Sequence, residues 1–324
     1  MTGARVAIPT TLSPAAFNRR RANAFVRTLR GETMGTSWSA TIVDPPASAE
    51  AAIGVVLAEV IAQMSHWDAG SQLSRINRAA PGGWHRIAPA FGEVMTAAID
   101  IAAKSGGSFD PAMGALVDLW GFGPPGPVAR QPDADAVATA RAASGSDAFE
   151  FDPLLLRLRR TRAAHLDLSG IAKGYAVDAV AARLRELGCR DFLIEIGGEL
   201  VGVGIQPDGQ PWWVDVETPD HLVVTPLRVA LHNLTIATSG DYRRTADFGS
   251  HTIDPRTGRP IANGVASVSV LHQSCMQADG WASALTVLGP QAGMALAEQE
   301  RLAARMLDRA GGEWISPALQ AMLD

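Results

Sequence analysis

The stretch HLDLSGIAKGYAVDAVAARLRELG, residues 165–188, joins a glycine-bounded turn to a predicted helix. Its apolar positions recur at steps of three and four: Val177, Val180, Leu184 and Leu187. This spacing predicts a helix with one buried stripe. Just before the stripe lies Lys173, one of only two lysines in a chain whose other basic side chains are arginines.

Lys173 and the neighbouring glycines place a compact cation where a helix begins. Free N–H groups and the helix dipole at such a position attract anions, and an ammonium suits a single phosphate oxygen. The glycine spacing is not that of a P-loop, and the Lys-Ser/Thr pair of that motif is missing. The segment therefore indicates either an anion site or a solvated lysine on a first turn.

Composition excludes some functions. The chain has 324 residues and a net charge of −5, which argues against a nucleic-acid-binding surface. Cys189 and Cys275 fit no metal or redox spacing and are expected to be buried hydrophobic side chains. No apolar run approaches the length of a membrane span.

The first 30 residues hold an arginine cluster that no apolar segment follows. This pattern is not that of a secretory signal, and the segment lacks a lipid-attachment cysteine. We predict a mobile extension over residues 1–30, a single domain over 31–324, and a cytoplasmic location.

The remaining patterns predict an α+β fold with mainly antiparallel sheets, because the consecutive strands are short and largely hairpin-linked. A long Gly- and Pro-rich loop is expected over residues 105–127, and a final helix is expected to close the chain. Helices are predicted at about 48–64, 91–104, 133–144, 177–188 and from about 278. Strands are predicted at about 34–44, 149–160 (as a hairpin), 191–198, 199–206, 211–217, 225–233, 234–240 and 264–272.

Two further stretches carry candidate chemistry. Asp279 and Ser283 are four residues apart in a predicted helix, so they share one face and offer the hard oxygen ligands that suit Mg²⁺ beside phosphates. The alternative is that Asp279 caps the helix and Ser283 packs inward. Residues 239–256 gather hydroxyl, acid, imidazole and guanidinium groups between turns, and His251 there could act as a general base. The alternative for Asp254 is that it caps its own turn.

Eight blocks, taken together, resemble the ApbE family of FAD:protein FMN transferases over roughly residues 31–290. In chain order they are ETMGTSW, SHWDAGSQLSRIN, FDPAMGALVDLWGFG, DLSGIAKGYAVDAVAARL, EIGGEL, IATSGDYRR, HTIDPRTGRP and ADGWASALTVLG. The resemblance implies an α+β fold of duplicated β-α-β motifs with FAD between the halves. It also implies a Mg²⁺-dependent reaction that transfers FMN from FAD to a threonine or serine hydroxyl of a partner flavoprotein and releases AMP.

The resemblance further implies roles for individual residues. Asp279, Ser283 and the Ala172 carbonyl would bind the metal, His251 would activate the acceptor, and Lys173 and Asp279 would act in catalysis. Residues implied to bind FAD are Met34, Gly35, Trp67, Ser71, Asn77, Asp110, Trp120, Gly170, Lys173, Tyr175, Glu199, Ser239, Gly240, Asp241, Tyr242 and Asp254.

This chain also departs from the family pattern. Ser283 stands where threonine is usual, Gln72 where glutamate is usual, and Ala112 where threonine is usual. Many members carry a lipoprotein signal and are periplasmic, so a periplasmic location is the alternative if the N-terminus given is incomplete. Two other functions stay open: an FAD pyrophosphatase in which water replaces the acceptor hydroxyl, and a flavin-binding carrier without catalysis.

Overall fold

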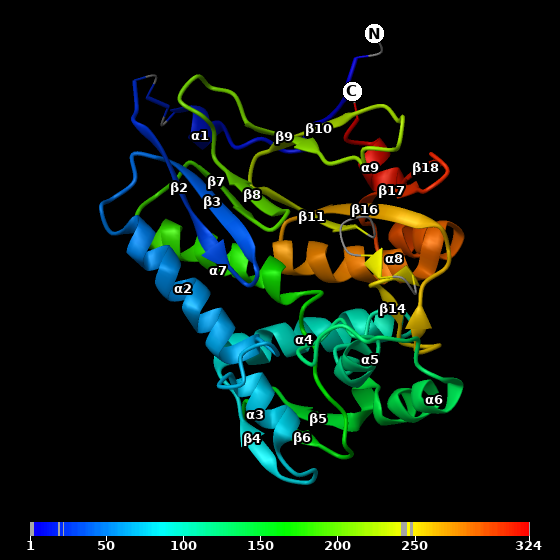
Figure 1. The fold of residues 1–324 in the computed structure, drawn as a ribbon. Coiled ribbons are helices and arrows are strands. Elements are labelled where there is room, and N and C mark those ends of the chain that lie inside the picture. The colour runs from blue at the N-terminus through cyan, green and yellow to red at the C-terminus, as the bar shows by residue number, and fades with distance from the viewer. Residues whose placement is uncertain (1–2, 19, 22, 241–244, 247–248, 324) are drawn as a thin grey trace.

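An eight-stranded sheet forms the centre of the fold in a computed structural model, which describes residues 3–18, 20–21, 23–240, 245–246 and 249–323 (Figure 1). Its strand order is β18-β17-β16-β11-β8-β7-β3-β2, and every neighbouring pair is antiparallel. The strands are β2 (Val26–Thr33), β3 (Thr36–Val43), β7 (Phe192–Ile196), β8 (Glu199–Val203), β11 (Leu234–Gly240), β16 (Val265–His272), β17 (Ala303–Asp308) and β18 (Glu313–Ile315). The predicted α+β class with mainly antiparallel pairing is confirmed.

Helices α2 (Ala49–Met64), α7 (Ala172–Glu186) and α8 (Cys275–Gln299) cover one face of this sheet (Figure 1). The buried positions of α2 include Ile53, Leu57, Val60 and Met64, which recur at helical spacing. Val177, Val180 and Leu184 of α7 are also buried, as their spacing predicted, and the two helices share one apolar cluster with the sheet.

Helix α8 has a break inside it. Gly289 has φ 78° and ψ −177°, and Pro290 follows it. A proline cannot donate the helical hydrogen bond and its ring disfavours a continuous helix, so the glycine absorbs the change of direction.

A small second sheet covers part of the other face. It has the order β1-β10-β9, from strands β1 (Arg5–Ala7), β10 (Leu227–Leu231) and β9 (Trp212–Val216). Helices α1 (Pro14–Asn18) and α9 (Pro317–Gln320) complete this side of the chain. Strands β1 and β2 both begin within the predicted extension, so residue 30 is not an element boundary and these strands are paired parts of the fold.

The lower layer in Figure 1 contains α4 (Pro89–Lys104), three short helices and a three-stranded sheet with the order β4-β6-β5. Its other elements are α3 (Gln72–Arg78), α5 (Gly114–Leu119), α6 (Ala134–Ala143), a 3-10 turn at Ser146–Ala148, β4 (Trp84–Arg86), β5 (Phe149–Asp152) and β6 (Arg157–Arg160). One large apolar cluster joins this layer to α8. Two-stranded pairs β12 (Thr245–Ala246) with β13 (Gly249–Ser250), and β14 (Ile253–Asp254) with β15 (Arg259–Pro260), follow β11.

Two sequence expectations about elements differ from the structure. Residues 105–127 were expected to be a loop, yet α5 lies within them because Leu116 packs into an apolar cluster with Trp120 and Val137. A final helix was expected to close the chain; α9 does so with only four residues, and strands β17 and β18, which the sequence did not predict, lie between α8 and α9. No described helix is long and apolar enough to cross a membrane.

The contact between α7 and α8 leaves no room for a side chain at Gly174. A Cβ atom there would lie 2.3 Å from the Cys275 carbonyl oxygen and 2.8 Å from the Asp279 Cβ. Gly54 in α2 is also helical, but nothing lies within 4 Å of its Cβ position. The two glycines therefore form a matched pair in which only Gly174 is constrained by packing.

We predict that Gly174→Ala destabilises the protein by at least about 2 kcal/mol, since overpacking against backbone forces a shift of one helix. Gly54→Ala should stabilise it by up to about 1 kcal/mol through helix propensity. Urea denaturation measures both, and a Gly174→Ala variant as stable as the wild type would contradict the close contact.

A second constraint ties the chain ends to the central sheet. Glu313 on β18 accepts a hydrogen bond from Arg305 Nε at 2.7 Å and pairs with Arg5 on β1. Burial by itself raises the pKa of the Glu313 carboxyl, but the two arginines outweigh burial and hold this pKa below its usual value. A depressed pKa in the folded state stabilises the protein above pH 4.5, and this stabilisation is lost as the pH falls through the folded pKa.

We therefore predict that Glu313→Gln lowers the free energy of unfolding at pH 7 by about 3 kcal/mol, because Arg305 is left buried without its counter-ion. The difference from the wild type should shrink as the pH falls below 4.5. Denaturation at several pH values measures it, with Asp215→Asn in the exposed Arg228–Asp215 pair as a control expected to lose far less. A difference in unfolding free energy between the wild type and Glu313→Gln that does not change with pH would contradict this role of the Glu313 charge.

Candidate active site

Lys173 lies in the first turn of α7, where the sequence predicted a cation at a helix start. Its Nζ donates a hydrogen bond to Glu199 Oε1 at 2.6 Å. Glu199 begins β8 directly after a two-residue turn, in which Gly197 and Gly198 have φ 63° and 104°. Such positive values favour glycine and allow the tight hairpin that brings Glu199 to the lysine. The structure thus pairs two residues that the sequence assigned separately.

Asp279 and Ser283 of α8 contact the segment on either side of Ala172. Asp279 Oδ2 accepts a hydrogen bond from the Gly174 N–H at 2.9 Å, and Ser283 Oγ donates to the Gly170 carbonyl at 3.4 Å. The three predicted metal-binding residues are therefore brought together where α7 begins against the middle of α8. Their role as ligands stays a prediction.

The electrostatics of this cluster are governed by burial. Glu199 and Asp279 are 1% and 6% exposed. Burial raises the pKa of both carboxyl groups, that of Glu199 to about 8, although Lys173 acts in the opposite direction. Burial lowers the pKa of the Lys173 ammonium, but the charges of Glu199 and Asp279 outweigh it and the net shift is upward. Two buried acids thus share one cation, and additional positive charge would be favourable here.

An unpaired buried atom supports a ligand at this place. Glu199 Oε2 is buried and has no hydrogen-bond partner among the described residues. A buried carboxylate oxygen without a partner carries a desolvation cost that a bound cation or donor relieves. The described residues hold no cluster of three or more His, Cys, Asp or Glu. A metal would therefore combine the acidic oxygens with hydroxyl, carbonyl and phosphate oxygens, a donor set that Mg²⁺ accepts.

The predicted flavin-binding loop before α3 is held by serines and by a contact between His66 and Asp167. Ser71 is fully buried, donates to the Ser65 carbonyl at 2.5 Å and caps α3 by accepting from the Ser74 N–H. Trp67 stays 59% exposed on this loop, so its ring is accessible to a flat ligand. His66 Nδ1 lies 3.3 Å from Asp167 Oδ1, which links the loop to the segment that leads into α7.

Asn77 and Tyr175 connect the layers around this loop. The Asn77 side chain donates to the Leu166 carbonyl at 2.9 Å and accepts from the Leu166 N–H at 2.8 Å, which fixes α3 against the strand-like approach to α7. Tyr175 is half-buried and packs against two apolar clusters. The contacts of Asn77 and Tyr175 hold parts of the fold together. Flavin binding by these two residues stays a prediction.

The second predicted cluster surrounds the turn after β14. Trp120 is 3% exposed, and its Nε1 donates to the Gly258 carbonyl at 2.9 Å. Asp254 accepts from the Arg256 N–H and from its guanidinium, so Asp254 caps its own turn, as the alternative interpretation proposed. The His251 ring meets the Phe122 ring edge to face, with centroids 6.2 Å apart.

The other predicted residues are found in turns and at strand ends. Met34 and Gly35 form the turn between β2 and β3 with φ 48° and 71°, a geometry that suits a two-residue hairpin. Asp110 accepts from the Ala112 and Ser146 N–H groups, while burial raises the pKa of its carboxyl. Ser239 and Gly240 end β11. Asp241 and Tyr242 lie outside the described residues.

Sequence reasoning missed one residue that shapes the site, and it named a second, Gln72, without a contact. Asp178 accepts hydrogen bonds from Ser274 Oγ and from the Cys275 and Met276 N–H groups, so an acid on α7 caps the N-terminus of α8. Asp178 lies four residues after Gly174, so the two residues share one face of α7, the face that contacts α8. This spacing was the signal in the sequence that could have identified Asp178. Gln72, which the sequence analysis named as a departure from the family pattern, donates to the Arg86 carbonyl and accepts from the Ala88 N–H, which a carboxylate could not do in both directions.

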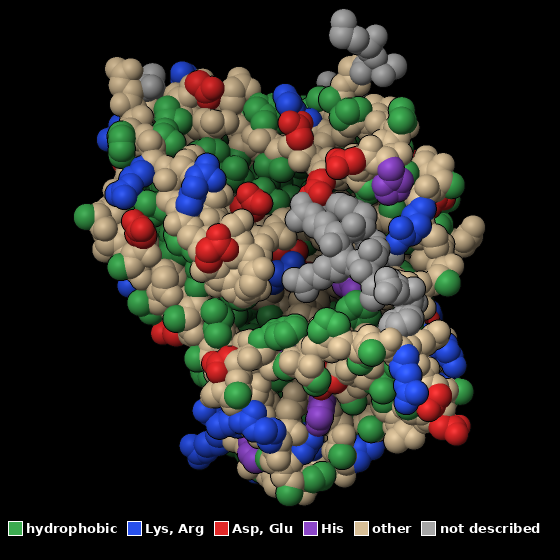
Figure 2. Space-filling model, in the orientation of Figure 1, with side chains coloured by type: hydrophobic (Ala, Val, Ile, Leu, Met, Phe, Trp, Pro, Cys, Tyr) green, Lys and Arg blue, Asp and Glu red, His purple; other side chains and the backbone are tan. Residues whose placement is uncertain are grey.

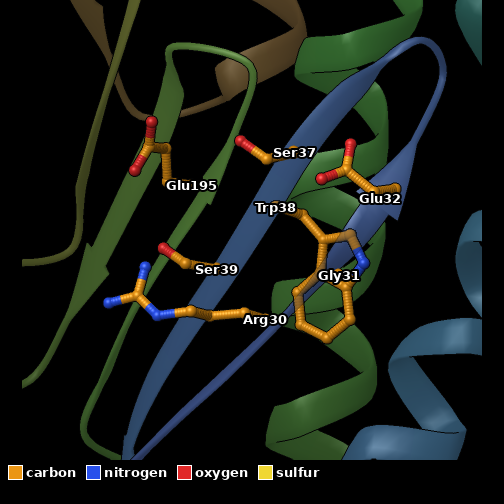
Figure 3. A pocket seen from close by; sticks show the side chains of 7 residues that line it. All are labelled: Arg30, Gly31, Glu32, Ser37, Trp38, Ser39 and Glu195. Carbon is orange, nitrogen blue, oxygen red and sulfur yellow. The ribbon is translucent and has the colours of Figure 1, made fainter.

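Hollows in the surface occur at two places. Figure 2 shows that the face in view is hollowed near its centre, above a row of hydrophobic side chains. A separate open hollow of about 290 Å³ lies on β2, β3 and β7, lined by Arg30, Gly31, Glu32, Ser37, Trp38, Ser39 and Glu195 (Figure 3). None of the site residues that the resemblance implies lines this second hollow.

The fold and the acid–lysine cluster define a protein whose family can now be stated. The model of the ApbE family matches residues 34–306, and the chain belongs to this family. The family prediction is confirmed.

Relatives and a solved structure agree with this assignment. The FAD:protein FMN transferase of Klebsiella pneumoniae is 34% identical over 310 residues, which cover 91% of this chain and 89% of the relative. The FAD:protein FMN transferase of Vibrio cholerae is 37% identical over 290 residues, 86% of each chain. The structure of the flavin transferase ApbE from Vibrio cholerae has a TM-score of 0.86 and 34% identity, and the match covers 92% of this chain and 99% of that one.

Proposed function

We propose that this chain transfers FMN from FAD to a threonine or serine hydroxyl of an acceptor flavoprotein, with Mg²⁺ bound where α7 meets α8. The observation that carries the proposal is the contact of Gly170 with Ser283 and of Gly174 with Asp279, which gathers oxygen donors around Ala172. The names of the relatives, FAD:protein FMN transferase, support the same reaction.

The donor set fits a magnesium ion. Asp279 supplies the carboxylate, Ser283 the hydroxyl and Ala172 the backbone carbonyl, and Glu199 Oε2 is a further unpaired oxygen close to Lys173. Mg²⁺ binds few protein ligands and keeps room for substrate phosphates. When bound, it would neutralise charge on the diphosphate oxygens of FAD.

The reaction breaks one anhydride bond and forms one phosphoester. The acceptor oxygen attacks the phosphorus of the FMN half, the P–O bond to AMP breaks, and AMP leaves with the electron pair. His251 takes the hydroxyl proton as general base, while Lys173, held by Glu199, stabilises developing charge on the phosphate oxygens. Trp67, exposed on its loop, offers a flat surface for the isoalloxazine ring.

Hydrolysis of FAD to FMN and AMP uses the same residues with water as the nucleophile. The two reactions are separated by weighing the products with and without an acceptor flavoprotein. Transfer gives an acceptor that carries FMN. Hydrolysis gives free FMN whether or not the acceptor is present. A carrier without catalysis would leave FAD intact.

We predict that Asp279→Asn lowers Mg²⁺-dependent AMP release and FMN transfer by roughly a thousandfold, because the loss of a metal's electrostatic stabilisation is worth several kcal/mol. Ser283→Ala should lower transfer less, and Ser283→Thr, which keeps the hydroxyl, should stay close to the wild type. Mass spectrometry of the acceptor and chromatography of AMP measure these rates. Wild-type turnover by a folded Asp279→Asn variant would remove this residue from the site.

A further inference from the structure

The hairpin between β5 and β6 presents an apolar tip to solvent. The tip, residues 153–156, includes Leu154 and Leu155, which are 92% and 59% exposed. Single exposed leucines are ordinary, but two adjacent ones at a protruding turn form a compact apolar surface.

The tip has a defined conformation. Asp152 Oδ1 accepts a hydrogen bond from the Leu155 N–H at 3.0 Å, and the Asp152 carboxylate also pairs with Arg157. Leu156 has φ 47°, its carbonyl accepts from the Ile87 N–H, and its side chain packs against the large core cluster. Leu156 thus anchors the turn while its two neighbours stay outside.

Three arginines and one tryptophan lie on the strands at the base of the tip: Arg157 and Arg159 on β6, and Arg86 and Trp84 on β4. We call these four residues the arginine collar. Strand β4 pairs with β6, which places Trp84 opposite Arg159 and Arg86 opposite Arg157. The guanidinium groups of Arg157 and Arg159 lie 4.4 Å and 4.8 Å from the centre of the Trp84 ring. Trp84 remains 38% exposed. A tryptophan and long cations behind an apolar tip match the boundary between acyl chains and headgroups.

The local charge is opposite to that of the whole chain. The net charge is −5, yet three arginines of β4 and β6 reach the surface, Arg86, Arg157 and Arg159, against two acids of β5, since Arg160 is buried. Arg157 and Arg159 pair with Asp152 and Glu150, which leaves Arg86 as the excess positive charge. Figure 2 shows Lys and Arg side chains gathered at the lower end of the molecule, where Figure 1 places these strands. Anionic lipids attract such cations at short range.

We propose that this hairpin tip docks the protein on an anionic lipid surface, with Leu154 and Leu155 entering the interface and the arginine collar contacting the headgroups. The charge of the collar and the protruding shape of the tip favour a lipid surface over a protein groove. The tip lies at the end of the molecule opposite the two termini (Figure 1) and does not include the acid–lysine cluster. The proposal is therefore independent of the proposed function.

Sedimentation with vesicles tests the proposal on the full chain. The wild type should bind vesicles of phosphatidylcholine mixed with phosphatidylglycerol, and bind less as salt is raised. The double variant Leu154→Ser/Leu155→Ser should bind roughly tenfold or more weakly, because two apolar side chains lose their burial. Val223→Ser, which alters a fully exposed valine before β10, is the matched control and should bind like the wild type. Circular dichroism checks that each variant folds.

A fluorescent label locates the contact. The native Cys189 and Cys275 are buried, so an environment-sensitive dye on Leu154→Cys reports on the tip, with Val223→Cys as its control. Only the dye at position 154 should shift to the blue on anionic vesicles. No vesicle binding, equal binding to pure phosphatidylcholine, or binding unchanged by the double serine variant would overturn the proposal. A blue shift with acceptor protein but not with vesicles would overturn it in favour of a protein partner.

Discussion

The close approach of α7 to α8 at Gly174 is the constraint on which the site depends. Because Gly174 has no side chain, the backbone of α7 lies close to α8, and the Gly174 N–H donates a hydrogen bond to the Asp279 side chain. Asp178, one turn further along α7, caps α8 from the same face. The contact therefore aligns the start of one helix with a buried acid of the other, and the sheet beneath adds Glu199 through a two-glycine turn.

This arrangement explains why a chain rich in arginine uses a lysine at position 173. A compact ammonium fits beside a carboxylate in a buried cluster, whereas a planar guanidinium needs room for several directed hydrogen bonds. The cluster holds two acids and one cation, and the pKa values of both acids are raised by burial. Two acids beside one cation favour the binding of a further cation at this cluster. A Mg²⁺ ion bound there would also bind phosphate oxygens of a substrate.

The sequence predicted the fold class, the family and most of the helices, because apolar periodicity and the order of the motifs are local signals. It also placed Asp279 and Ser283 on one helix by their spacing, and both lie in α8. It did not predict the Lys173–Glu199 pair or the Asp178 cap, since these join residues far apart in the chain. Strand β1 was missed for a related reason: its partner β10 is distant, and β1 has only three residues. The short helix α5 was hidden by flanking glycine and proline.

The most direct test of the central claim is crystallographic. Crystals grown with FAD and Mn²⁺, which substitutes for Mg²⁺ and gives an anomalous signal, should show a peak within about 2.5 Å of an Asp279 carboxylate oxygen and of a phosphate oxygen. A manganese peak elsewhere, with FAD bound and the Asp279 carboxylate still held only by the Gly174 N–H, would contradict the account.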